Sequence, residues 1–249
     1  MKYTDLHTHT VFSDGKNTAE EMVLSAISRG LKVIGISDHS HTSYDTSYCI
    51  KKQDIEKYIA EINALKEKYK GKIEVRLGIE QDFYGTESTA PYDYVIGSCH
   101  YLYIDGNYID IDYKLEFLTD TANRYFGGDI YCVLEKYYEN MENIVERTGA
   151  DIIGHFDLIS KLNEKTPFFD TKNPRYQKAW KKAADKLLKT GAVFEINTGG
   201  ISRGYTTKPY PESDIYNYLS RNNAKFIYSS DAHCVNDIAF MFDKIDTFY

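Results

Sequence analysis

The 249-residue chain lacks the features that mark membrane, secreted and disulfide-stapled proteins. No stretch approaches the roughly 18–20 consecutive apolar residues of a membrane-spanning helix, so no membrane partner is expected. The N-terminal sequence MKYTDLHTHT lacks the apolar core of a signal peptide, so export is not indicated. The four cysteines form no CxxC pair, which excludes a CxxC-type zinc ribbon and favours reduced thiols in a cytoplasmic protein.

Positive charge is also scarce. The chain has 30 Lys and Arg against 37 Asp and Glu, a formal net charge of −7, so we expect no long nucleic acid as a partner. No GxGxxG or GxxxxGK[ST] motif follows an apolar run, so nucleotide binding by such loops is not supported. No Pro, Gly or Ser-rich linker interrupts the sequence, and we expect a single domain over residues 1–249.

Short apolar runs alternate with amphipathic stretches of helical length. The pattern predicts strands at 2–6, 31–37, 73–79, 94–98, 151–154, 192–196 and 225–229. It predicts helices at 18–29, 54–69, 114–126, 129–148, 174–190 and 212–222, with a hairpin or loop excursion at 101–113. Repeated β-then-α order implies parallel strands joined by right-handed crossovers. Seven such units favour an α/β barrel, closed or nearly closed, and a doubly wound sheet is the alternative.

Histidines occur only where the predicted strands end. All seven lie there: His7, His9, His39, His41, His100, His155 and His233. Acidic residues share these positions, namely Asp14, Glu80, Glu195 and Asp231. In a parallel barrel the carboxyl ends of the strands converge on one rim. The sequence therefore predicts one pocket that holds many imidazoles and carboxylates.

Imidazole combined with carboxylate suits zinc, iron and manganese. His7 and His9 are two residues apart, so they point the same way from a strand and can reach one ion. The number of candidate ligands exceeds the usual four of one zinc ion, so we expect two or three ions that share a bridging carboxylate. Each residue alone also has a structural interpretation; Glu195, for example, could be a strand-end acid paired with a lysine.

Six motifs together carry a family resemblance. They are His7-Thr8-His9, SDHS at 37–40, the lone Glu80, GSCH at 97–100, IGHFDLI at 153–159 and SDAH at 230–233. This set resembles the polymerase and histidinol phosphatase (PHP) family from residue 3 to about 240. The run from 153 to Lys161 and the EINTGGISR segment at 195–203 look like a histidinol-phosphate phosphatase rather than a polymerase domain. The resemblance implies a distorted, TIM-like (β/α)7 barrel with a trinuclear metal centre.

The resemblance also implies a ligand set. One ion would take His7, His9, Glu80 and Asp231; a second would share Glu80 and add His100 and His155; a third would take Asp14, His39 and His233. Some members of the family have histidine at the position of Asp14, and an aspartate makes the ligand set harder. The expected cofactors are therefore two or three divalent ions of Zn, Mn or Fe.

The implied reaction is metal-dependent hydrolysis of a small-molecule phosphate ester, L-histidinol phosphate, to L-histidinol and phosphate. Arg203 follows a Gly-Gly turn, and its guanidinium can donate to two phosphate oxygens at once. Lys161 is the second candidate cation, although it could also be a solvated helix lysine. His41 is expected to donate to the phosphate or protonate the leaving alkoxide, with a capping role as its structural alternative. Acids and tyrosines should face the amine and imidazole, and loop position suggests Asp157, Tyr84 and Tyr101.

Two other functions compete with this one. The first is a PHP phosphoesterase that acts on a nucleotide, a cyclic phosphate or an oligonucleotide end. The second is a non-catalytic barrel that keeps its metal for structure, which the loss of two or more ligands would favour. No ligand position is vacant in this sequence, which argues against the second.

Overall fold

Seven parallel strands form the central sheet of the computed structural model, which describes residues 3–249. In order along the sheet they are β1 (Thr4–Asp5), β2 (Val33–Ile36), β3 (Glu74–Asp82), β4 (Tyr94–Ser98), β7 (Ile152–Ile153), β8 (Val193–Asn197) and β9 (Phe226–Ser229). The first predicted strand reached Lys2, which lies outside the described residues. Spatial order follows sequence order, as expected when each crossover lays the next strand beside the last.

The sheet almost closes on itself. Beyond β1 and β9, Thr8 and Ala232 form an isolated parallel bridge, and the His9 amide donates to the Ala232 carbonyl at 2.8 Å. This bridge joins the first and last strands just where the predicted site residues begin. The prediction of a nearly closed seven-stranded barrel is confirmed, and the doubly wound alternative is wrong.

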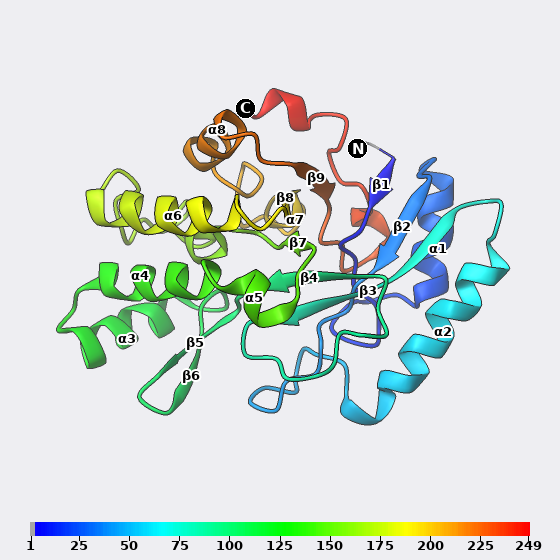
Figure 1. Cartoon of the computed structure of the whole chain (residues 1–249), viewed down its shortest axis with the longest axis horizontal. Helices are drawn as coiled ribbons and strands as arrows, with labels where there is room; N and C mark the ends of the chain where they lie inside the picture. Colours follow the sequence, from blue (N-terminus) through cyan, green and yellow to red (C-terminus); the bar gives the residue numbers. More distant parts are fainter. Residues whose placement is uncertain (1–2) are drawn as a thin grey trace.

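Helices cover the outside of the barrel (Figure 1). They are α1 (Ala19–Ser28), α2 (Ile55–Lys68), α3 (Leu115–Phe126), α4 (Ile130–Met141), α5 (Ile144–Thr148), α6 (Pro174–Leu187), α7 (Gly199–Ser202) and α8 (Ser213–Arg221), with short 3-10 turns at Lys52–Asp54, Leu158–Ser160, Val235–Asp237 and Ile245–Thr247. α1 starts with a capping box in which Thr18 and Glu21 satisfy each other's backbone amides. Within residues 3–249 no helix has the length and apolar character needed to cross a membrane.

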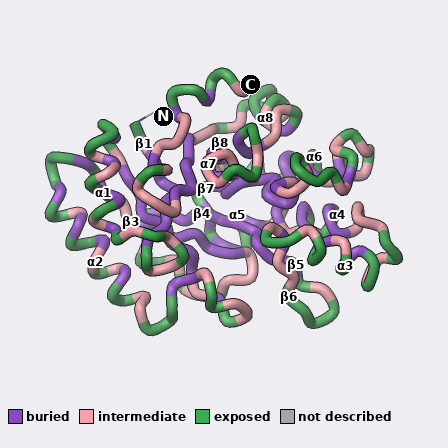
Figure 2. Tube along the Cα trace, turned by 180° about the vertical axis from the view of Figure 1, so that it is seen from behind, coloured by how far each residue is buried: buried purple, intermediate pink, exposed green. Residues whose placement is uncertain are grey.

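Burial follows this layering. The strands lie among buried segments at the centre, whereas the outer helices alternate buried and exposed faces (Figure 2). The predicted excursion at 101–113 is an antiparallel hairpin of β5 (Tyr101–Ile104) and β6 (Asn107–Asp110), which projects below α3 and α4 in Figure 1. The predicted helix at 129–148 is instead two helices, because the chain leaves α4 at Glu142 and restarts as α5.

One tyrosine fills the lower interior of the barrel. Tyr94 lies among Leu6, Ile96 and Ile152, and its hydroxyl donates to the Leu6 carbonyl at 2.5 Å. Gly35 and Gly78 make room for it, since a Cβ at either position would lie within 2.2 Å of the Tyr94 ring or hydroxyl. The lower barrel is therefore filled by side chains, and the polar residues occupy its upper end.

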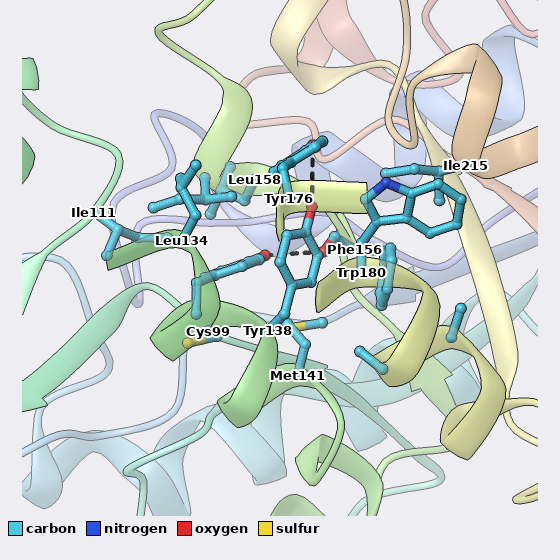
Figure 3. Packing of buried hydrophobic residues seen from close by; sticks show 14 of the residues in the cluster. Cys99, Ile111, Leu134, Tyr138, Met141, Phe156, Leu158, Tyr176, Trp180 and Ile215 are labelled. Carbon is cyan, nitrogen blue, oxygen red and sulfur yellow. Dashed lines mark hydrogen bonds between the residues drawn. The ribbon is translucent and has the colours of Figure 1, made fainter. Parts of the chain in front are cut away.

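A second cluster lies between the barrel, α4 and α6 and supports the loop that follows β7 (Figure 3). Tyr138 and Tyr176 share a hydrogen bond of 3.2 Å between their hydroxyls. Phe156, which directly follows His155, packs against Tyr138 with ring centroids 5.5 Å apart. Burial of large aromatic rings contributes strongly to stability, so this packing fixes the backbone that carries His155.

Candidate metal centre

The upper rim of the barrel opens into a cavity of about 960 Å³. Six residues from the predicted ligand set line it: Asp14, His39, His100, His155, Asp231 and His233. His7, His9 and Glu80 lie beneath, at 0–1% exposure, as the floor of the site. The ends of the parallel strands thus bring all nine residues to one end of the barrel.

Glu80 lies between two groups of imidazoles. Its Oε2 lies 3.3 Å from His7 Nε2 and 2.8 Å from His39 Nδ1. Its Oε1 lies 3.1 Å from His155 Nε2 and 3.5 Å from His100 Nε2. A carboxylate with nitrogen neighbours at both oxygens has the geometry of a bridge between two cations.

Asp231 and Asp14 supply the other acidic oxygens. Asp231 Oδ1 lies 3.3 Å from His9 Nε2 and 3.8 Å from His7 Nε2. Asp14 Oδ2 lies 3.3 Å from His233 Nε2, and its Oδ1 lies 3.7 Å from His39 Nε2. Ligand atoms of a tetrahedral zinc ion lie about 3.3–3.4 Å apart when each is about 2.0–2.1 Å from the metal. The spacing of these donors therefore suits divalent ions.

Several buried polar atoms in this group have no hydrogen-bond partner among the described residues. They are His7 Nε2, both ring nitrogens of His9, His100 Nδ1, His155 Nδ1 and Glu80 Oε2. Buried polar atoms in folded proteins are almost always satisfied, so a purely structural histidine cluster does not explain them. Cations beside His7 Nε2, His9 Nε2 and Glu80 Oε2 would satisfy those three atoms, and the residues fit such ions.

The protonation states of Glu80 and His9 also suit metal binding. Burial opposes ionisation of Glu80, but His39, His7 and His100 outweigh it and hold the pKa of Glu80 well below its usual range. Burial and the neighbouring His233 and His39 lower the pKa of His9 to about 3. At neutral pH Glu80 is therefore ionised and His9 neutral, the forms that bind metal. Burial opposes the charged form of His7, His39 and His100, but the neighbouring carboxylates raise the pKa of all three imidazoles, so a metal ion would displace protons from them.

Glu195 is paired with His7 and not with a lysine. Its Oε2 lies 2.8 Å from His7 Nδ1, and its Oε1 accepts the backbone amide of His155 and the side-chain amide of Asn197. A carboxylate at Nδ1 keeps the proton there and leaves Nε2 free for a metal. Glu195 and Asn197 therefore orient the histidines.

The sequence spacing of these supporting residues carries a signal of its own. Glu195 and Asn197 are two residues apart on β8, and Glu80 and Asp82 are two apart on β3, so each pair shares one face of its strand. Asp82 lies on the site side, with its Oδ2 3.3 Å from His100 Nδ1. Because side chains alternate between the two faces of a strand, an acid or amide two residues from a candidate ligand is expected to lie beside the same site.

Arg203 lines the cavity but is engaged with the protein. Its Nη2 lies 2.8 Å from Asp231 Oδ2, and its Nη1 donates to the Asp231 carbonyl at 2.9 Å. Asp231 has a φ of +51°, a left-handed conformation that costs a non-glycine residue roughly 1 kcal/mol. Arg203 therefore also holds Asp231 in place beside the histidines.

The other predicted substrate residues divide into two groups. Lys161 and Tyr101 line the cavity, and the Lys161 ammonium lies 2.7 Å from Asp112 Oδ2. His41, Asp157 and Tyr84 are not among the lining residues. His41 Nδ1 lies 3.1 Å from the Ile50 carbonyl, because the loop that follows β2 folds back on itself. That contact matches the structural alternative for His41.

Comparison with known proteins agrees with this geometry. A family model described as "PHP domain" matches residues 5–199. A Deinococcus radiodurans protein named "Probable histidinol-phosphatase" is 31% identical, over 96% of this chain and 89% of its own length. The crystal structure of HisK from Listeria monocytogenes has a TM-score of 0.80 at 24% identity, over 94% of this chain and 97% of that one.

A second solved structure has the same fold. It is histidinol phosphate phosphatase from Lactococcus lactis, complexed with Zn, L-histidinol and phosphate, with a TM-score of 0.69 at 22% identity over 99% of this chain and 93% of that one. The family model covers well over half of the chain, and the strand-end motifs it spans are those that surround Glu80. The chain belongs to the PHP domain family and groups there with the histidinol-phosphatases.

Proposed function

We propose that this protein hydrolyses L-histidinol phosphate to L-histidinol and phosphate. The observation that carries the proposal is the placement of Glu80 between two groups of buried histidines at the floor of an open cavity. The name of the Deinococcus radiodurans relative supports the substrate, as does the Lactococcus lactis structure, which holds L-histidinol and phosphate.

The proposed cofactors are two or three divalent ions of Zn, Mn or Fe. His7, His9, Glu80 and Asp231 would hold one ion; Glu80, His100 and His155 a second; and Asp14, His39 and His233 a third. Four overlapping groups of residues support this set, and within each group the donor atoms lie within 4.8 Å of one another. The groups are His9, Asp14, His39 and His233; His7, Glu80 and His155; His7, His9 and Asp231; and His39, Glu80 and His100. Such ions supply positive charge that polarises a phosphate ester and lowers the pKa of the attacking water.

The chain's own cations then orient the phosphate. Arg203 presents its guanidinium from the cavity wall while Asp231 holds the group in place. Lys161 lines the same cavity, and Asp112 fixes its ammonium by the 2.7 Å ion pair. Positioned charge at the phosphoryl oxygens stabilises the transition state without reorganisation. His41 stays a candidate for donating to the phosphate or protonating the leaving alkoxide, because the Ile50 carbonyl occupies only its Nδ1.

Steady-state kinetics tests the proposal. The protein is reconstituted with Mn, Fe or Zn, and kcat/KM is compared for L-histidinol phosphate, p-nitrophenyl phosphate, a dinucleotide and a cyclic phosphate. We expect L-histidinol phosphate to exceed every other substrate by at least about a hundredfold, because only it uses the binding energy of the cavity beyond the phosphate. A higher kcat/KM for the nucleotide or cyclic phosphate would contradict the substrate assignment.

A further inference from the structure

Four tyrosines gather on one wall of the cavity. This wall comprises the loop after β2 and the β5–β6 hairpin, and its rings are Tyr44, Tyr48, Tyr101 and Tyr108. Tyr44 and Tyr108 are stacked, with ring centroids 4.0 Å apart and planes 12° from parallel. The Tyr44 hydroxyl donates to Asp82 Oδ1 at 2.5 Å, and Asp82 Oδ2 accepts the backbone amide of His100. The tyrosine wall is therefore tied to the strand that carries Glu80.

Two carboxylates, Asp110 and Asp112, lie where the chain leaves the β5–β6 hairpin at the end of this wall. Asp112 is paired with Lys161, so its charge is compensated. Asp110 is half-buried, and among residues 3–249 no Lys, Arg or His nitrogen lies within 4.0 Å of its carboxylate. Its Oδ1 accepts the backbone amides of Asp112 and Tyr113, both at 2.9 Å. Asp110 thus adds to the cavity lining a carboxylate that is not directly paired with a cation among residues 3–249.

Tyr48 contacts the histidine group directly. It lines the cavity, and its hydroxyl is buried beside Thr42 and Tyr44. Its ring lies edge-on to His39, with centroids 4.9 Å apart, and is stacked with Tyr101 at 6.0 Å. Tyr48 therefore joins the tyrosine wall to the histidine group, so a molecule bound along this wall would lie next to the histidines.

We propose that Asp110 binds the positively charged amino group of the leaving alcohol. This inference rests on the proposed function and names the residue that would give it its specificity. The site would then select phosphate esters whose alcohol carries an ammonium group. Neutral esters would reach the same histidine centre without this contact.

The matched substitution is Asp110→Asn. Asparagine keeps Oδ1 as an acceptor for the amides of Asp112 and Tyr113, so the turn is preserved and only the charge is lost. Asp120→Asn is the control, because Asp120 lines the same cavity from α3 but is exposed. The control removes the same charge from the cavity without removing the proposed contact.

We expect Asp110→Asn to raise KM for L-histidinol phosphate about ten- to hundredfold, as for loss of a hydrogen bond between charged groups. Its kcat/KM for p-nitrophenyl phosphate should stay within about twofold of wild type, since that ester has no amine and the reacting groups are intact. Asp120→Asn should stay within about twofold for both substrates, because a charge at an exposed position is screened.

Calorimetric binding of L-histidinol and of its analogue without the amino group gives a readout independent of turnover. Wild type should bind L-histidinol at least about tenfold more tightly, and Asp110→Asn should bind the two alike. Equal preference for L-histidinol in wild type and Asp110→Asn would overturn the assignment of Asp110, while wild-type kinetics still supported the proposed function. An equal loss in Asp120→Asn would also overturn it, as an effect of overall charge. A wild type that did not prefer L-histidinol phosphate would overturn the proposed function itself.

Discussion

The carboxylate of Glu195 offers a sharp test because its two oxygens have separate tasks. One accepts the Nδ1 proton of His7 at 2.8 Å, and the other accepts the backbone amide of His155. Glu195→Gln keeps the size of the side chain but replaces one acceptor with a donor. Whichever way the amide is turned, an NH2 group then faces a donor.

The two orientations have different costs. If the NH2 group faces His7, the imidazole must move its proton to Nε2, the nitrogen that lies 3.3 Å from Glu80. Loss of such a supporting contact typically weakens metal affinity ten- to hundredfold, about 1.4–2.7 kcal/mol. If the NH2 group faces the amide of His155, two buried donors meet, which costs about 1–3 kcal/mol of unfolding free energy.

Two assays on the same samples separate these outcomes. Competition with a chelator gives the metal affinity, and thermal unfolding of the metal-free protein gives the stability. Glu74→Gln is the control, because Glu74 is exposed at the opposite end of β3. We expect Glu195→Gln to lose metal affinity, stability or both, and the control to lose neither. A Glu195→Gln protein with wild-type values in both assays would refute the orienting role of Glu195.

Two further perturbations address the site from other directions. Arg203→Ala should lower kcat/KM for L-histidinol phosphate by about tenfold to a thousandfold and should also weaken metal retention, because Arg203 holds Asp231; an unchanged kcat/KM would remove Arg203 from the site. In the metal-free protein, burial lowers the pKa of the His100 imidazole. The neighbouring Glu80 carboxylate outweighs burial and raises this pKa from 6.5 to about 9. The charged imidazole then contributes roughly 3 kcal/mol to the unfolding free energy below pH 6.5, a contribution lost as the pH rises through 9. Thermal unfolding between pH 6 and pH 10 should show this decline, and a Tm that rose across this range would contradict it.

The strand ends could be predicted because periodicity and chemistry agree there. Apolar runs such as 94–98 are long enough to be buried strands, and β4 has the same bounds in the structure. His7 and His9 follow β1 on either side of Thr8, which forms the isolated bridge to Ala232, and their ring centroids lie 5.1 Å apart. Parallel topology then brings distant residues to one rim without any knowledge of side-chain contacts.

The loops could not be predicted in the same way, because tertiary contacts decide their course. His41 follows the ligand candidate His39 by two residues, yet the chain between them is no longer a strand, so alternation fails. The Thr42 hydroxyl donates to the Asp45 carbonyl in a local turn, and His41 is not among the residues that line the cavity. Glu195 likewise had two open interpretations, since its partner His7 is 188 residues away in sequence.

The metal content of wild type and Glu80→Gln, measured by elemental analysis on protein purified without chelators, tests the central claim most directly. Glu80 has histidine nitrogens at both carboxylate oxygens, so removing its charge should affect more than one ion. We expect wild type to carry two or three divalent ions per chain, and Glu80→Gln to lose at least one of them together with its phosphatase activity. A Glu80→Gln protein with its full complement of metal would contradict the bridging role on which the proposed function depends.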